Sequence, residues 1–228
     1  MAKLSKKEIE KPDRFVTAMN AFQHYIQTHQ VKFFIGLGIL VVMMCAGFVW
    51  YFIDRNTEQA ALKLYAQIFS KSAQINSRQA NVDTQAEIRK SYEDLIKKYP
   101  GTKAALISHY ELGNDFLHRL NVDAAIKELE QFIAGTKNGN ELRNIAYSSL
   151  GYCYEAKKDY AKAIDMFKNA VQSEQGSAFA GMIYYELGGI YELQGKKSDA
   201  LAQYKNAVSQ KNDPLTDAMI KRKIADLS

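Results

Sequence analysis

The sequence has little cysteine, little proline and little excess charge, and each shortage narrows the class of protein. Its two cysteines, Cys45 and Cys153, are far apart, which excludes a cysteine-based zinc module and a disulfide within the C-terminal part. Three prolines leave long stretches free to form helix. The net charge is +5, with its basic excess concentrated in residues 1–32. The near-neutral remainder lacks the positive field that nucleic-acid binding requires.

Residues 33–53 form an uninterrupted apolar stretch without a single charge (FFIGLGILVVMMCAGFVWYFI). A helix of this length spans about 30 Å, the thickness of a bilayer's hydrocarbon core. Trp50 and Tyr51 suit the interfacial aromatic belt. A buried core helix is the alternative, but such helices rarely contain so long an apolar run. Because bulky residues follow the stretch and the leader is long, we predict an uncleaved signal anchor and not a cleaved signal peptide.

The basic residues predict how this anchor is oriented. Residues 1–32 hold six of them, whereas only Arg55 and Lys63 follow closely after the apolar stretch. The positive-inside rule then keeps the leader in the cytoplasm and places the C-terminal domain in the periplasm of a bacterium, as a single-pass protein of the inner membrane. An organelle setting with a cytosolic domain stays open. Residues 13–30 have an apolar stripe at helical spacing, suited to a membrane surface, a partner or a plain extension of the anchor.

Three segments of the C-terminal part share one pattern when they are aligned on Gly113, Gly151 and Gly188. An aromatic residue follows each glycine by three (Phe116, Tyr154, Tyr191), an alanine by twelve (Ala125, Ala163, Ala200) and a bulky residue by sixteen (Leu129, Phe167, Tyr204). This spacing resembles the tetratricopeptide repeat (TPR), in which small residues stand where two antiparallel helices approach most closely. The extra residues beyond the 34-residue unit should lie in loops or helix ends, and 135–141 (GTKNGNE) is one expected loop.

The complete layout is therefore an all-α chain in which a TPR-type solenoid of helical hairpins follows a single transmembrane helix. We assign residues 1–32 to a basic leader, 33–53 to the anchor, 54–101 to a degenerate first hairpin, and 102–228 to three repeats with a capping helix. In the first hairpin we expect helices at about 56–75 and 91–100. The capping helix should begin at Asp213-Pro214 and present Met219, Ile220, Ile224 and Leu227 as its apolar face.

The layout also resembles one family, the bacterial inner-membrane TPR proteins related to YfgM, the ancillary subunit of the SecYEG translocon. The resemblance extends over about residues 32–228 and includes the basic leader, the anchor, a weak first repeat and the closing segment Met219–Ser228 (MIKRKIADLS). It implies a periplasmic domain that binds translocon subunits, periplasmic chaperones or emerging chains. The leader is longer and tyrosine is more abundant than that family suggests.

The sequence predicts no enzyme, cofactor, metal site or small-molecule substrate. Its four histidines form no metal-binding pair, and it has no glycine-rich phosphate loop. Cys153 has no evident base and reads as a small core residue. The carboxylates on the repeat helices fit solvated or groove-lining positions better than catalytic pairs.

We instead predict a protein-binding groove lined by the first helix of each repeat. The TPR pattern assigns ten residues to it: Ile107, Tyr110, Asn114, His118, Ser148, Tyr152, Glu155, Met182, Tyr185 and Glu192. Ordinary packing between helices is an equal alternative for each of them. Tyrosines offer amphipathic contact area for an extended or a helical peptide. Two functions remain open, a scaffold at the Sec translocon and an assembly or structural factor of another cell-envelope complex.

Overall fold

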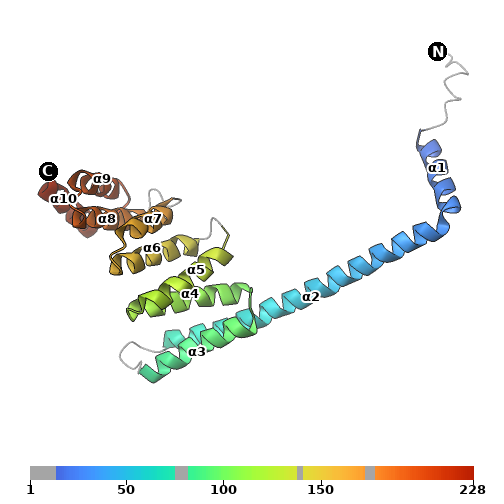
Figure 1. Ribbon diagram of the computed structural model, residues 1–228, viewed down its shortest axis with the longest axis horizontal. Coiled ribbons are helices and arrows are strands. Elements are labelled where there is room, and N and C mark those ends of the chain that lie inside the picture. The colour runs from blue at the N-terminus through green and yellow to red at the C-terminus, as the bar shows by residue number, and fades with distance from the viewer. Residues whose placement is uncertain (1–13, 75–81, 138–140, 173–177) are drawn as a thin grey trace, which may run out of the picture. The chain divides into compact units, whose positions relative to one another are not determined.

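A computed structural model describes residues 14–74, 82–137, 141–172 and 178–228, and within these ranges the chain is helical and contains no strand (Figure 1). Ten helices fall in these ranges: α1 (Arg14–Thr28), α2 (Gln30–Gln74), α3 (Val82–Lys98), α4 (Lys103–His118), α5 (Val122–Gly135), α6 (Glu141–Ala156), α7 (Tyr160–Val171), α8 (Ala178–Leu193), α9 (Lys197–Val208) and α10 (Pro214–Leu227). The chain divides into two compact units, residues 1–56 and 57–228.

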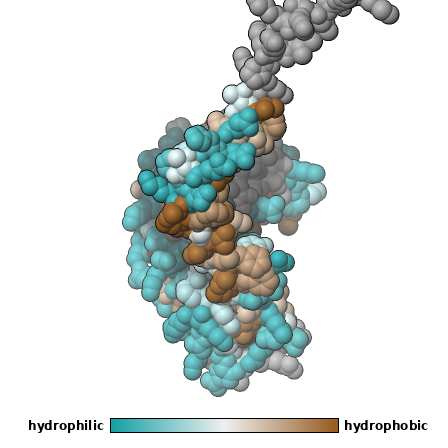
Figure 2. Space-filling view, turned by 90° about the vertical axis from the view of Figure 1, so that its right-hand side faces the viewer, coloured by the Kyte–Doolittle hydropathy of each residue, from teal (hydrophilic) through white to brown (hydrophobic). Residues whose placement is uncertain are grey.

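The first unit contains α1 and the apolar part of α2. Among the described helices, α2 is long and apolar enough to cross a membrane, and is compatible with a single-pass anchor. Its large hydrophobic side chains between residues 34 and 53 are exposed. Exposed apolar surface of this extent is typical of segments that contact lipid or another protein. Figure 2 shows hydrophobic side chains gathered in the middle of the face that it presents.

Helix α1 covers most of the range in which the sequence predicts an amphipathic helix. Three of its apolar side chains recur at helical spacing and are exposed: Phe15, Met19 and Phe22. The ring of Phe22 contacts that of Phe33 edge-on, with 6.4 Å between centroids. Lysines 3, 6, 7 and 11 of the leader lie outside the described residues.

The second unit is a stack of helical hairpins in which α4–α5, α6–α7 and α8–α9 are the three repeats. Each first helix begins ten residues before its aligned glycine and ends five after it, and each second helix begins nine after it. The repeats therefore differ in length only from the end of their second helices onward. Part of the expected loop 135–141 lies outside the described residues, but Gly135 ends α5 and Glu141 begins α6.

Inside each repeat the aligned glycine packs against the bulky residue sixteen positions later. A Cβ built on Gly113 would lie 2.6 Å from Cγ of Leu129, and one on Gly151 would lie 2.6 Å from Cδ1 of Phe167. These distances are too short for real atoms, so glycine is required where the two helices touch. The aligned alanines and bulky residues are all fully buried. The predicted TPR packing is confirmed.

The turn between the two helices of each repeat also has a common geometry. Seven residues after each glycine the backbone is left-handed, with φ of 60° at Leu120, 59° at Lys158 and 72° at Gly195. Glycine adopts this conformation at no steric cost, whereas leucine and lysine adopt it only with strain between their Cβ and the backbone. The sequence signals this turn at Gly195 alone.

The hairpin before the first repeat is longer than its sequence suggests. Its second helix, α3, begins at Val82 and not near Ser91, because Ile88 extends the apolar stripe that continues through Tyr92 and Leu95. Ala61 and Ile68 of α2 belong to the same buried cluster as Tyr92 and Leu95. At the other end α10 begins at Pro214, as predicted, and buries Ile220 completely. Met219 is 50% exposed and lies outside the apolar face that the sequence assigns to it.

Candidate protein-binding surface

The ten predicted groove residues all lie on α4, α6 and α8, the first helices of the three repeats. We call the surface that they outline the first-helix face. Each of them lies six or three positions before the aligned glycine of its repeat, or one, four or five positions after it. They are not equally accessible, since His118 and Met182 are exposed, Ser148 is only 4% exposed, and the others are half-buried.

Aliphatic side chains occupy the same register six residues before each glycine. They are Ile107 on α4, Ile145 on α6 and Met182 on α8, of which Ile145 is 38% and Met182 43% exposed. Ile145 is not among the residues predicted from the sequence, although counting six residues back from Gly151 identifies it. Ile145 and Phe179 line a shallow hollow of about 190 Å³ together with Glu141 and Asn144. The row Ile107–Ile145–Met182 is the aliphatic part of the first-helix face.

The three predicted groove tyrosines are partly exposed, but each also packs against the second helix of its own repeat. Tyr110 packs on Phe132 with 5.3 Å between ring centroids, Tyr152 on Phe167 at 5.1 Å, and Tyr185 on Tyr204 at 5.5 Å. In every repeat, therefore, one tyrosine of the first helix contacts an aromatic ring of the second. Burial is the main reason that the pKa of Tyr152 rises to about 12.

Polar contacts link the first helices of neighbouring repeats. Ser149 of α6 donates a hydrogen bond of 2.8 Å to Oδ1 of Asn114 on α4, so the predicted groove residue Asn114 also joins the first two repeats. Tyr152 of α6 and Glu186 of α8 lie close enough for each to influence the pKa of the other. The bond between Ser149 and Asn114 joins the first helices of the first two repeats.

An acidic hollow lies near the C-terminal ends of α6 and α8. It has a volume of about 350 Å³ and is lined by Glu155, Glu186, Gly189, Glu192, Leu193 and Lys223. Gly189 contributes no side chain to it. Lys223, from the capping helix α10, is the single cation among these residues, and its ammonium lies 2.8 Å from Glu192.

The three carboxylates of this hollow have different electrostatic environments. Burial raises the pKa of Glu155, and burial together with the nearby charge of Glu155 raises the pKa of Glu186. By contrast, hydrogen bonds from Lys223 and Tyr204 lower the pKa of Glu192. Glu192 is therefore a stably ionised member of an ion pair, whereas Glu155 and Glu186 carry charge in a setting that disfavours it. Glu186 is one of the repeat-helix carboxylates for which the sequence leaves a solvated or a groove-lining position open, whereas Lys223 was not predicted to line a groove.

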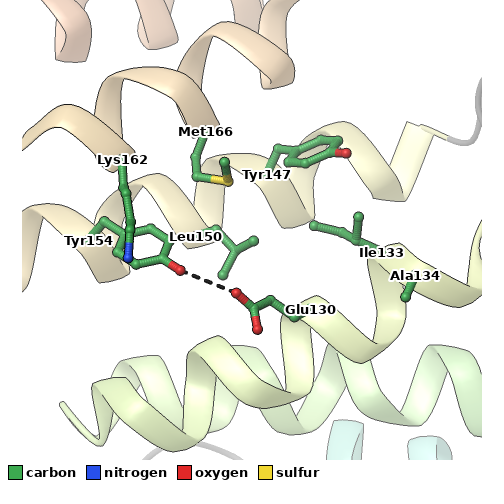
Figure 3. Close-up of a pocket in the computed structure, with 8 residues that line it drawn as sticks. All are labelled: Glu130, Ile133, Ala134, Tyr147, Leu150, Tyr154, Lys162 and Met166. Carbon is green, nitrogen blue, oxygen red and sulfur yellow. Dashed lines mark hydrogen bonds between the residues drawn. The ribbon is translucent and has the colours of Figure 1, made fainter. Parts of the chain in front are cut away.

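A second, more apolar cavity of about 560 Å³ lies among α5, α6 and α7 (Figure 3). Ile133, Leu150 and Met166 form its apolar lining. Its two charged residues already have partners. Glu130 accepts a hydrogen bond of 3.2 Å from Tyr154, and Lys162 lies over the Tyr154 ring and near Asp159. None of the predicted groove residues lines this cavity.

Within the described part of the chain, no group of three or more histidine, cysteine or acidic side chains is arranged to hold a metal ion. Cys153 is fully buried, as its sequence context predicts, and burial raises the pKa of its thiol to about 11. A thiol in this environment is a packing residue and not a nucleophile.

The fold defines a TPR-like helical-repeat protein, a class that generally mediates protein–protein interaction and is generally non-catalytic. The chain belongs to the tetratricopeptide repeat-like domain family, whose model matches residues 23–228. No curated protein sequence matches the chain.

Solved structures share the fold at low sequence identity. A crystal structure of MamA protein is similar with a TM-score of 0.53 and 17% identity, over 75% of this chain and 86% of that one. A putative kinesin light chain of Podosopora anserina, with nearly identical TPR-like repeats, is similar with a TM-score of 0.53 and 14% identity, over 76% of this chain and 84% of that one. At these identities the likeness shows the fold alone.

Proposed function

We propose that this protein is a membrane-tethered scaffold that binds other proteins through its first-helix face. The observation that carries the proposal is the common register of that face, because Ile107, Ile145 and Met182 present aliphatic side chains at the same position of three successive repeats. A packed core does not require half-exposed aliphatic side chains, and partner surfaces often contain them.

The tether is residues 33–53 of α2. Its length, its lack of charge and its exposed side chains support a single-pass anchor. The six basic residues of the leader favour a cytoplasmic N-terminus and a periplasmic repeat domain in a bacterial inner membrane. The domain limits that accompany this proposal are 1–32, 33–53, 54–101 and 102–228. Protease treatment of spheroplasts tests the orientation, because only a periplasmic domain is cleaved once the outer membrane is opened.

The partner that we favour is the Sec translocon, with the protein linking it to periplasmic chaperones that receive emerging chains. The support is the resemblance to the YfgM-related family in the leader, the anchor, the weak first repeat and the closing segment. Crosslinking in intact cells, followed by pull-down from detergent-solubilised membranes, tests it. Recovery of translocon subunits or periplasmic chaperones is the expected result, and recovery of neither rejects this assignment.

Another envelope machine is the second candidate, because anchored TPR domains serve many complexes. In that case the same crosslinking experiment recovers the subunits of a different assembly and no translocon component. Measured turnover that is lost on substitution of one residue would overturn the non-catalytic interpretation in either case.

A further inference from the structure

We propose that the first-helix face selects partner segments that combine aliphatic side chains with lysine or arginine. The inference rests on the proposed scaffold function and names the chemistry of the partner at the same surface. Two parts of the face carry it: the aliphatic row Ile107–Ile145–Met182 and the acidic hollow that contains Glu155 and Glu186.

The aliphatic row favours apolar side chains of the partner. Ile145 and Met182 are exposed, and the hollow beside Ile145 is large enough to accept a small aliphatic group. Covering one such side chain with another removes apolar surface from water at roughly 25 cal/mol per Å². Methionine adapts its shape to different partners, which suits the end of the row that Met182 occupies.

The acidic hollow favours a cation. Of its three carboxylates, Glu192 is paired with Lys223, whereas no ion pair that involves described residues includes Glu155 or Glu186. Burial raises the pKa of both, which disfavours their ionised forms in the free protein. A lysine or arginine of the partner would supply the missing charge. The hollow has room for it because Gly189 has no side chain.

The two parts are separated along the helix in a way that sets the size of the ligand. On α6, Ile145 and Glu155 are ten residues apart, about 15 Å at 1.5 Å per residue. An extended segment covers that distance with about five residues at 3.3 Å each. A short peptide therefore reaches the aliphatic row and the acidic hollow at once. The cavity among α5, α6 and α7 is less suited, because its charged side chains already have partners.

Binding of three matched synthetic peptides to the full chain tests the proposal. The chain is held in phosphatidylcholine nanodiscs, and empty nanodiscs measure binding to lipid. The first fluorescent 12-residue peptide combines leucine with lysine. The second has glutamate in place of every lysine, and the third has serine in place of every leucine. Fluorescence anisotropy should give at least tenfold tighter binding for the first peptide than for either other. Equal binding of all three, or no binding of the first, overturns the proposal.

Variants locate the binding on the first-helix face. Ile145→Ser and the double change Glu155→Gln with Glu186→Gln should each weaken binding of the first peptide at least fivefold. The matched controls are Leu120→Ser, which removes an exposed aliphatic side chain from a turn, and Asp165→Asn, which removes an exposed carboxylate from α7. Both should bind within twofold of the unchanged chain, and circular dichroism confirms that all variants are folded. Loss of binding in the controls as large as in the face variants contradicts the proposal.

The same variants separate this inference from the proposed scaffold function. If crosslinking in cells recovers partner proteins and Ile145→Ser abolishes that recovery, both stand. If Ile145→Ser and the double Glu155/Glu186 variant each recover as much partner protein as the unchanged chain, the scaffold function stands and the inference is wrong. If no partner protein is recovered with the unchanged chain, the scaffold function is wrong, and the inference, which depends on it, is wrong as well.

Discussion

Gly188 of α8 lies directly against the ring of Tyr204 on α9. A Cβ added to Gly188 would stand 2.5 Å from Cε1 of that ring, and Tyr204 is completely buried, so the ring has nowhere to move. The next residue, Gly189, is different, because a Cβ there would lie 3.9 Å from Oη of Tyr204, an ordinary contact. Two adjacent glycines of one helix thus have opposite structural requirements.

We therefore expect Gly188→Ala to lower the free energy of unfolding by about 1–3 kcal/mol, as overpacking of a core contact typically does. Gly189→Ala is the matched control and should be neutral or stabilising by up to about 1 kcal/mol, because alanine is the better helix former. Urea unfolding of the two variants, followed by circular dichroism, checks both. Equal effects of the two substitutions would show that the glycine–tyrosine contact does not limit packing in this repeat.

The helix pairs, their order and their glycine and alanine contacts could be predicted from sequence because one pattern recurs three times. Gly113, Gly151 and Gly188 stand at sites where close helix approach admits no side chain, and a rule that packing enforces repeatedly is visible in the residues. The capping helix was predictable for a local reason, since Asp213 accepts hydrogen bonds from the backbone N–H groups of Leu215 and Thr216.

The first-helix face was less predictable, because packing between helices does not require a particular residue type at an exposed position. The TPR pattern points to Ser148, which is buried, and not to Ile145, which is 38% exposed. Lys223 could not be assigned to the hollow from sequence, since it reaches Glu192 from a helix 31 residues further along the chain. The left-handed turn at Leu120 and Lys158 was invisible because neither residue type favours that backbone. Alignment with Gly195 is the signal that identifies it.

That turn gives a second prediction. Leu120 is 80% exposed and has a φ of 60°, so its side chain contributes backbone strain and no core packing. Leu120→Gly should raise the free energy of unfolding by about 0.5–1 kcal/mol by relieving the left-handed strain. The reverse change, Gly195→Ala, should lower it by about 1 kcal/mol, because alanine pays the steric cost of the left-handed backbone. Thermal unfolding measures both, and a destabilised Leu120→Gly variant would contradict the common geometry of the turns.

The pair Glu192–Lys223 should make the attachment of α10 sensitive to acid. Lys223 and Tyr204 hydrogen-bond the ionised carboxylate and lower the pKa of Glu192 below its ordinary value of 4.5. A lowered pKa in the folded state gives stability that is present above the unfolded pKa and lost as the pH falls through the folded one. Glu192→Gln should therefore cost about 0.5–1 kcal/mol at pH 7, and the difference from the unchanged chain should vanish as the pH falls well below 4.5.

Melting temperatures of the two proteins between pH 7 and pH 3 provide the measurement. Lys223→Gln should give a similar loss at pH 7, and the double variant should lose less than the sum of the two single ones, because both remove the same interaction. Strictly additive losses would mean that the ion pair contributes nothing to the stability of the cap.

Glu155 should have the opposite pH dependence. Burial raises its pKa, so the folded state disfavours the ionised carboxylate at neutral pH. That destabilisation is complete above the folded pKa, decreases as the pH falls through it, and disappears below the unfolded value of 4.5. Glu155→Gln keeps the shape and removes the charge, so at pH 7 it should melt about 1–2 °C above the unchanged chain, and the advantage should shrink on acidification. Asp165→Asn, an exposed carboxylate on α7, is the control and should melt within 1 °C of the unchanged chain at every pH. A Glu155→Gln variant that melts lower at pH 7 would show that the ionised carboxylate stabilises the folded chain, and would contradict the view that Glu155 is an uncompensated charge available to a partner.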